Sequence, residues 1–231
     1  MKKFKKGKLI ILEGTDGSGK TVQFERLLKR LRKMKIKVKS LDFPRYDKDS
    51  SYFVKQYLNG NYGDWKEVSA YRASLFYALD RFAALNQLNK WLKDGEVVIA
   101  NRYVASNLVH QGLKIKNSAG RKKFYQWLYN LEYNILGLPC PDLNIFLHVP
   151  AEIAFRLIDY KKKREYLGNK KRDIHERDIL HLKKAEKIFC EVVDLYPRDF
   201  KTIECTRQGK MLSKDEIEKK TWKLIQRILK K

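Results

Sequence analysis

Short apolar runs alternate along the chain with longer stretches in which apolar residues recur every three or four positions. The runs predict buried strands at 8–13, 37–42, 96–100, 142–148 and 200–205. The longer stretches predict helices at 22–34, about 68–92, 119–136, 151–160, 173–195 and 214–229. No two runs are joined by the short turn of a β-hairpin, so the alternation predicts βαβ units.

Strands that alternate with helices favour an α/β fold with a parallel sheet covered on both faces. We therefore expect three layers, α/β/α, around a five-stranded parallel sheet, within a single domain over 1–231. Ligands of such folds bind at the carboxyl ends of the strands. Functional residues are thus expected just after positions 13, 42, 100 and 148.

Composition agrees with a globular chain, because 43% of the 231 residues are apolar, enough for a sizeable core. The longest purely apolar run, Leu9–Leu12, is far below the roughly 20 residues of a membrane span, and no signal-peptide core follows the basic start. We expect a cytoplasmic protein without a membrane partner. The three cysteines are far apart, which predicts reduced thiols rather than a disulfide framework or a zinc site.

Charge is the unusual feature, because 51 Lys and Arg against 27 Asp and Glu give a net charge of +24. A chain this basic favours a polyanionic partner: nucleic acid, an anionic membrane or phosphorylated small molecules. The lysines are scattered and no basic block interleaved with aromatic residues stands out. Compositional bias is therefore the main explanation, and nucleic-acid binding is not expected. A basic tail at 1–7 and a dense basic cluster at 161–172 are the local exceptions.

The predicted first strand leads into Gly14–Thr21 (GTDGSGKT), which satisfies the phosphate-loop pattern GxxxxGK[ST] between a strand and a helix. Glycines let backbone N–H groups turn toward phosphate oxygens, and the helix N-terminus adds a favourable dipole. Lys20 is expected to reach the β- and γ-phosphates, and the Thr21 hydroxyl to bind Mg²⁺. The predicted triphosphate-binding residues are Gly14, Thr15, Asp16, Gly17, Ser18, Gly19, Lys20 and Thr21.

The loop alone does not separate a kinase from a GTPase or a motor ATPase. The base-reading NKxD element of GTPases is not present, because 169–172 (NKKR) lacks the aspartate. A motor ATPase would want an apolar strand ending in Asp, whereas the third predicted strand is followed by Asn101 and Arg102. Small-molecule phosphoryl transfer in a P-loop NTPase fold is favoured by elimination.

Further segments follow in order: Phe43–Tyr46, Ala78–Arg81, Asn101–Asn107 and Gly137–Asp142. Together with the phosphate loop they resemble the thymidylate kinase family of nucleoside monophosphate kinases over about residues 8–205. The resemblance implies transfer of the ATP γ-phosphate to dTMP with Mg²⁺, giving dTDP and ADP for DNA precursor synthesis. It also implies a homodimer packed through helices, including the one predicted at 68–92.

The resemblance further implies a dTMP site. Arg45 and Tyr46 would approach the acceptor phosphate, and Arg102 would bridge phosphates. Tyr77 takes the place of an aromatic residue that stacks on thymine, and Arg81 that of an arginine that hydrogen-bonds the base. A place in the apolar core is the alternative for Tyr77. The implied set is Asp16, Phe43, Arg45, Tyr46, Tyr77, Arg81, Arg102, Asn107 and His110.

Catalytic roles are implied for Lys20, Asp16, Arg102 and a lid at about 160–173. Family members carry a catalytic arginine either in the variable positions of the phosphate loop or in the lid. Positions 15–18 hold no base, so the resemblance is to the lid-arginine kind. The candidate lid arginines are Arg164 and Arg172, with the neighbouring lysines as alternatives.

Metal ligation is implied for Thr21, Asp16 and Glu176. A plain helix start is the alternative role of Glu176, because carboxylates are favoured in a first helical turn. The family usually has Asp where this chain has Asn101, whose amide keeps hydrogen bonding but loses a charge that helps to hold Mg²⁺. We expect weaker metal affinity or a larger share for Asp16.

A second departure is His110, where relatives commonly carry a tyrosine that crowds the sugar 2′ position. A smaller imidazole is expected to relax selection against a 2′-hydroxyl; a purely structural histidine is the alternative.

Other functions stay as alternatives. A deoxynucleoside kinase would want a carboxylate base after the second strand, where Arg45 suits a phosphate-bearing acceptor instead. A nucleoside monophosphate kinase of broader specificity is a further alternative. A basic nucleic-acid-binding protein with a vestigial nucleotide site is disfavoured by the retained Lys20 and the acceptor arginines.

Overall fold

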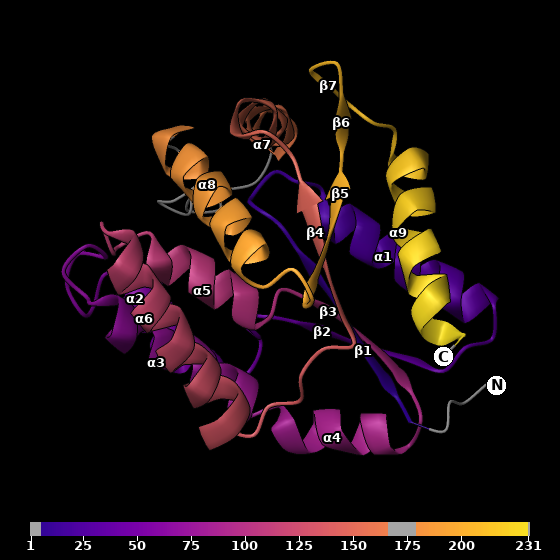
Figure 1. Cartoon of the computed structure of the whole chain (residues 1–231), viewed down its shortest axis with the longest axis horizontal. Helices are drawn as coiled ribbons and strands as arrows, with labels where there is room; N and C mark the ends of the chain where they lie inside the picture. Colours follow the sequence, from indigo (N-terminus) through magenta and orange to yellow (C-terminus); the bar gives the residue numbers. More distant parts are fainter. Residues whose placement is uncertain (1–5, 166–178, 231) are drawn as a thin grey trace.

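The computed structural model describes residues 6–165 and 179–230. Its centre is a five-stranded sheet in the order β2-β3-β1-β4-β5, in which all neighbours are parallel (Figure 1). The strands are β1 (Lys8–Glu13), β2 (Val38–Asp42), β3 (Val97–Asn101), β4 (Leu143–His148) and β5 (Phe200–Glu204). The predicted fold class is confirmed, and each strand begins and ends within one residue of the predicted range.

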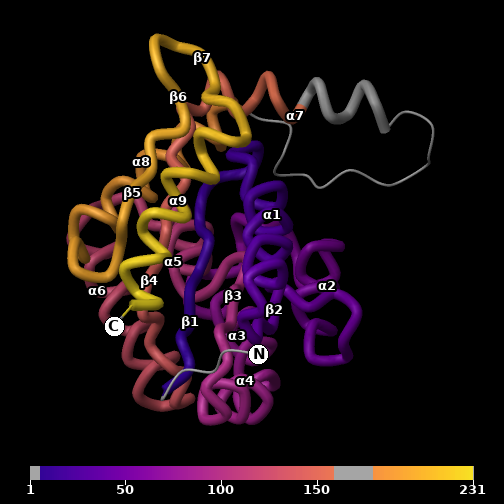
Figure 2. The backbone as a smooth tube through the Cα atoms, turned by 90° about the vertical axis from the view of Figure 1, so that its right-hand side faces the viewer, coloured from indigo at the N-terminus to yellow at the C-terminus, as the bar shows by residue number. Residues whose placement is uncertain are grey.

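Helices cover both faces of this sheet. The larger ones are α1 (Lys20–Lys33), α3 (Ala70–Phe82), α4 (Leu85–Lys93), α5 (Val104–Gly112), α6 (Ser118–Tyr129), α7 (Ala151–Glu165), α8 (Ile179–Leu195) and α9 (Lys214–Leu229). Figure 1 shows α1 and α9 on one side of the sheet and α5, α6 and α8 on the other. Figure 2, turned by 90°, places α7 at the end of the molecule where β1 leads into α1.

The alternation of side chains along β1 explains the two cores. Ile10 and Leu12 pack in one cluster with apolar residues of α1 and α9. Leu9 and Ile11 pack in another, with Leu88 of α4. Because successive strand residues point to opposite faces, one fully apolar strand supplies both layers.

The predicted helix at 68–92 is instead two helices, α3 and α4, with Ala83 and Ala84 between them. Ala84 and Leu88 are buried against β3, whereas the buried residues of α3 include the polar Asp80 and Arg81. One straight helix cannot present both faces, and nothing in the periodicity marks the break. The predicted helix at 119–136 similarly changes into a π-helix, η2 (Asn130–Ile135), after α6.

Short elements were missed. The expectation of no hairpin is wrong, because β6 (Thr206–Arg207) and β7 (Lys210–Met211) pair antiparallel across Gln208 and Gly209. Both turn residues have positive φ, as a two-residue hairpin turn requires, but Gln-Gly is not its usual sequence signal. The 3-10 turn η1 (Asp49–Ser51), α2 (Tyr52–Leu58) and α5 were also not predicted.

The predicted basic tail is shorter than expected. Residues 1–5 lie outside the described part of the chain, but Gly7 is buried and its N–H donates to the Leu92 carbonyl at 2.8 Å. A Cβ on Gly7 would lie 2.6 Å from the Leu92 Cα, so this position belongs to the packed fold. No helix within the described ranges is long and apolar enough to cross a membrane.

Candidate active site

The phosphate loop connects β1 to α1 at the carboxyl edge of the sheet. Gly17 and Gly19 have φ of 79° and 80°, where side chains with a Cβ are disfavoured. A Cβ on Gly17 would lie 2.5 Å from the Ala154 carbonyl oxygen, so this turn also packs closely against α7. The Lys20 ammonium donates to the Thr15 carbonyl at 2.7 Å. Burial and the nearby charge of Arg102 lower the pKa of Lys20 to about 7, and an anion beside it would favour the charged form.

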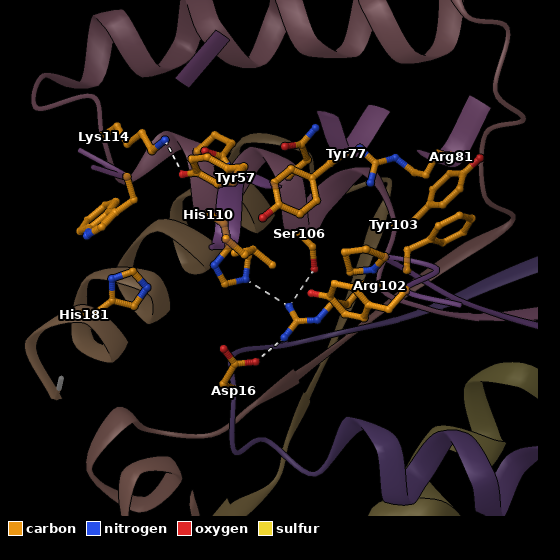
Figure 3. Close-up of a pocket in the computed structure, with 17 residues that line it drawn as sticks. Asp16, Tyr57, Tyr77, Arg81, Arg102, Tyr103, Ser106, His110, Lys114 and His181 are labelled. Atoms are coloured by element: carbon orange, nitrogen blue, oxygen red, sulfur yellow. Dashed lines mark hydrogen bonds and ion pairs between the residues drawn. The ribbon is translucent and has the colours of Figure 1, made fainter. Parts of the chain in front are cut away.

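Arg102 directly follows β3 and is the hub of the site. Its backbone adopts φ of 64°, rare for a residue with a side chain, and its N–H donates to the Leu12 carbonyl at 2.9 Å. Its guanidinium donates to Ser106 Oγ at 3.2 Å, to His110 Nε2 at 3.1 Å and to the Asp16 carboxylate (Figure 3). The unusual backbone thus aims one charged side chain back across the phosphate loop.

Asp16 lies between two cations. Burial alone would raise its pKa, but the charges of Arg102 and then Lys20 outweigh it and hold the pKa well below its ordinary value. The Lys20 Nζ is 3.9 Å from Asp16 Oδ1. Asp16 is therefore a carboxylate at neutral pH.

Glu13, the last residue of β1, anchors the start of α5. Its fully buried carboxylate accepts from the Tyr103 N–H at 2.7 Å and from the Ser106 hydroxyl at 2.6 Å. Burial raises the pKa of Glu13, because a buried charge is unfavourable, and the two hydrogen bonds partly offset this effect. The contacts fix the turn that carries Arg102.

Two cavities meet at this hub. The phosphate-loop cavity is lined by Lys20, Thr21 and Asn101 among others. The second cavity, here called the aromatic cavity, is lined by Asp16, Phe43, Pro44, Tyr46, Tyr57, Leu58, Trp65, Tyr77, Arg81, Arg102, Tyr103, Ser106, Asn107, His110, Gln111, Lys114 and His181. Asp16 and Arg102 line both cavities.

The predicted base-site residues come together in the aromatic cavity. Tyr77 and Arg81 reach it from α3, and His110 reaches it from α5 (Figure 3). Asn107 of α5 also lines it. Tyr77 lines the cavity, and its ring also packs edge-on against that of Tyr57, with 6.3 Å between the ring centroids. Its side chain therefore belongs both to the cavity lining and to the packed interior. Phe43 and Tyr46 line the cavity as well.

Arg45 has partners of its own in the structure, and its predicted contact with the acceptor phosphate stays a prediction. Arg45 does not line the aromatic cavity, and its guanidinium donates to the Asp80 carbonyl at 2.8 Å and to Ser50 Oγ at 2.9 Å. Its backbone N–H also donates to the Asp80 carboxylate at 2.8 Å. Arg45 therefore ties the segment after β2 to α3, because the buried Asp80 needs these donors.

Asn101 has a partner that sequence reasoning missed. Asp42 and Asn101 are register neighbours at the ends of β2 and β3, and Asn101 Nδ2 donates to Asp42 Oδ1 at 2.9 Å. A carboxylate is thus present next to position 101, on Asp42 of the neighbouring strand. Burial raises the pKa of Asp42. The pairing follows from strand register, which the sequence alone does not give.

The lid lies largely beyond what the structure describes. Arg172 and Glu176 lie outside the described residues, and Arg164 is in the last turn of α7, where only the backbone is described. Their predicted roles stay predictions.

Several cavity residues were not foreseen. Lys114 donates to the Tyr57 hydroxyl at 2.7 Å and to the Val68 carbonyl at 2.8 Å, and Trp65 packs edge-on against His181. They come from loops and helices far apart in the chain and carry no motif, so no local pattern could have grouped them.

The comparisons with known proteins agree with this geometry. The family model for thymidylate kinase matches residues 12–217. The chain belongs to the thymidylate kinase family. Thymidylate kinase of Mycobacterium tuberculosis is 33% identical over 186 residues, which is 80% of this chain and 85% of that protein. Thymidylate kinase of Caldicellulosiruptor saccharolyticus is 30% identical over 191 residues, which is 82% of this chain and 88% of that protein.

The solved structure of thymidylate kinase from Candida albicans shares the fold. Its TM-score is 0.71 at 23% identity, and the match covers 96% of this chain and 92% of that one. His110 contacts Arg102, whereas Asn101, which directly precedes Arg102 in the chain, contacts Asp42.

His110 is the residue for which the sequence predicts an effect on sugar selectivity. Because arginine only donates, His110 Nε2 accepts from Arg102, which places the imidazole beside that guanidinium and leaves its short ring in the cavity lining. We predict that His110→Tyr raises the preference for dUMP over UMP about tenfold, since steric exclusion by a few atoms is worth about that much. The ratio of kcat/KM for the two nucleotides measures it, and an equal ratio in both proteins contradicts the prediction.

Proposed function

We propose that this protein transfers the γ-phosphate of ATP to dTMP, giving dTDP and ADP. The observation that supports this most is that Asp16 and Arg102 line both cavities. A triphosphate held by the phosphate loop and a monophosphate held in the aromatic cavity would meet at these two residues. The family membership supports the same reaction.

The charges at the hub suit this chemistry. Donor and acceptor are both polyanions, so the main task of the protein is to cancel repulsion and align oxygens. Lys20 would contact the donor phosphates, and the planar guanidinium of Arg102 would grip oxygens of both substrates. No covalent nucleophile is required, because the acceptor phosphate oxygen already carries charge.

Oxygen ligands suitable for Mg²⁺ face the phosphate-loop cavity. Thr21 and Asp16 line it, and the buried Oδ1 of Asn101 has no hydrogen-bond partner in the described part of the chain. No cluster of three His, Cys, Asp or Glu that could hold a metal by itself occurs there. We propose that Thr21 and Asp16 hold the ion together with ATP, with Asn101 accepting from its water. Neutralisation of phosphate charge is what the ion supplies when bound.

The test is ADP release from ATP and Mg²⁺ with dTMP, dUMP, thymidine, UMP, CMP, GMP and AMP as parallel acceptors. We expect dTMP to give the highest kcat/KM. Preferential turnover of thymidine would move the assignment to a deoxynucleoside kinase, and similar turnover of several monophosphates to a kinase of broad specificity. No turnover with any acceptor contradicts the proposal.

We also propose a cytoplasmic homodimer. Tyr71, Leu75, Leu79 and Phe82 follow one face of α3 and are each 40–45% exposed. Four large apolar side chains on one exposed helix face are typical of a protein–protein contact. A second copy of the chain is the partner that the family resemblance implies for this helix.

The α3 stripe gives a direct prediction on oligomeric state. Light scattering is expected to give a dimer mass for the wild type and a monomer mass for Leu75→Glu/Leu79→Glu, because charges would be buried in the contact. Leu195→Glu, at an exposed apolar position of α8, is the matched control and should stay dimeric. A wild-type monomer at about 10 μM, or an unchanged double variant, contradicts the assignment.

A further inference from the structure

Glu132 is a fully buried carboxylate that none of the roles above uses. It lies in the π-helix η2, is 0% exposed, and binds the guanidinium of Arg81 through Nε and Nη2. It also accepts from Asn107 Nδ2 at 3.0 Å. Burying a carboxylate is unfavourable unless it is paired, and both of its partners line the aromatic cavity. Glu132 itself does not line it.

The contacts of Asn107 fix which way its amide points. Nδ2 donates to the Ser74 carbonyl at 3.1 Å and to Glu132 at 3.0 Å, and both partners can only accept. The reverse orientation would set the amide oxygen against two acceptors. The hydrogen-bond network therefore assigns the orientation, as it must when amide nitrogen and oxygen look alike.

This orientation leaves Asn107 Oδ1 as the atom available to a ligand. Asn107 is 3% exposed, and within residues 6–165 and 179–230 its Oδ1 has no hydrogen-bond partner. A buried acceptor without a donor is unfavourable, so the site is incomplete without a donor from the ligand. Glu132 takes two of the donor nitrogens of Arg81 and leaves Nη1 for the same ligand.

Asn107 Nδ2 and Arg81 Nη2 donate to the same oxygen of Glu132, so one carboxylate holds both an acceptor, Asn107 Oδ1, and a donor, Arg81 Nη1, here called the fixed pair. Thymine and uracil present the complementary pair, an N3–H donor beside the O4 acceptor. Cytosine presents the opposite pair, an N3 acceptor beside the N4 amino donor. The N3 acceptor of cytosine would face the acceptor Asn107 Oδ1, and its N4 amino donor would face the donor Arg81 Nη1.

We propose that Glu132 is the positioning residue that makes this site select thymine and uracil over cytosine. It does so by orienting the Asn107 amide and holding Arg81, without touching the base. The proposal rests on the proposed function, since it needs a pyrimidine nucleotide in the aromatic cavity.

The local sequence explains how an acidic residue reaches this position. Phe124 and Leu128 are buried on α6, and Glu132 continues that face one turn later. The helix is a π-helix at this point, a form that recurs at functional sites. A charge at an apolar position of a helical pattern is the signal that could have identified Glu132 from the sequence.

The test is Glu132→Gln, which keeps the shape but replaces one acceptor with an amide nitrogen. Glu132 Oε1 accepts from Asn107 Nδ2 and Arg81 Nη2, and Oε2 accepts from Arg81 Nε. In one orientation the new amide nitrogen faces the donor Arg81 Nε, and in the other it faces both donors at Oε1, so either orientation disturbs the fixed pair. We expect the ratio of kcat/KM for dTMP over that for dCMP to fall at least about tenfold, with the larger change in KM, because a ground-state contact is lost. The matched control is Glu191→Gln, whose carboxylate pairs with Arg121 at 2.6 Å and not with a cavity residue.

The control should lose thermal stability and keep the substrate ratio. An unchanged ratio in Glu132→Gln, in a protein that still turns over dTMP, overturns the inference and leaves the proposed function intact. Absence of turnover in the wild type overturns the function itself.

A measurement on the wild type decides the matter if Glu132→Gln does not fold. N3-methylated dTMP lacks the N–H that Asn107 Oδ1 would accept, so calorimetry should show binding at least about 100-fold weaker than that of dTMP. Equal affinity for both nucleotides contradicts the assigned orientation of Asn107.

Discussion

The ion pair between Asp16 and Arg102 is the interaction on which the rest of the site depends. It joins the phosphate loop after β1 to the turn after β3, two segments that a parallel sheet brings to one edge. Arg102 makes this contact with a left-handed backbone conformation. Glu13 stabilises the turn that follows by accepting from the Tyr103 N–H. Strain of this kind persists only where surrounding contacts determine it, as they do here.

The same two residues line both cavities. In the protein described here, Arg102 is balanced by Asp16, so its charge is partly compensated before any phosphate arrives. Phosphates on both sides would compete with Asp16 for the guanidinium, while Lys20 lies on the donor side. A basic site that is preorganised in this way needs little rearrangement during transfer. The surplus of 51 Lys and Arg over 27 Asp and Glu is spread along the whole chain, whereas the proposed function needs only these few cations.

Much of this arrangement was predictable because it follows from local sequence. The apolar run Leu9–Leu12 and the glycine pattern after it specify a buried strand and a phosphate loop, and Asn101–Asn107 identifies the segment after β3. These are contiguous motifs whose chemistry requires fixed spacing. Because the carboxyl ends of parallel strands lie at one edge of the sheet, these two segments are expected to lie close together.

The rest depends on tertiary pairings that leave no contiguous signal. Asp42 meets Asn101 through strand register, and Arg45, in the segment after β2, donates to the buried carboxylate of Asp80 in α3. Glu132 reaches Arg81 across 51 positions of sequence. The break between α3 and α4 likewise has no signal in the sequence, because the apolar periodicity continues through it.

The central claim is that Arg102 bridges donor and acceptor phosphates, and Arg102→Met tests it most directly. Arg121→Met removes an arginine that pairs with Glu191 away from both cavities and controls for the loss of a partly buried ion pair. Steady-state kinetics with ATP and dTMP should show kcat lowered at least about 100-fold in Arg102→Met, the size of effect expected when a transition-state charge contact is lost, and near-normal kcat in the control. A kcat for Arg102→Met within twofold of the wild type would contradict the account.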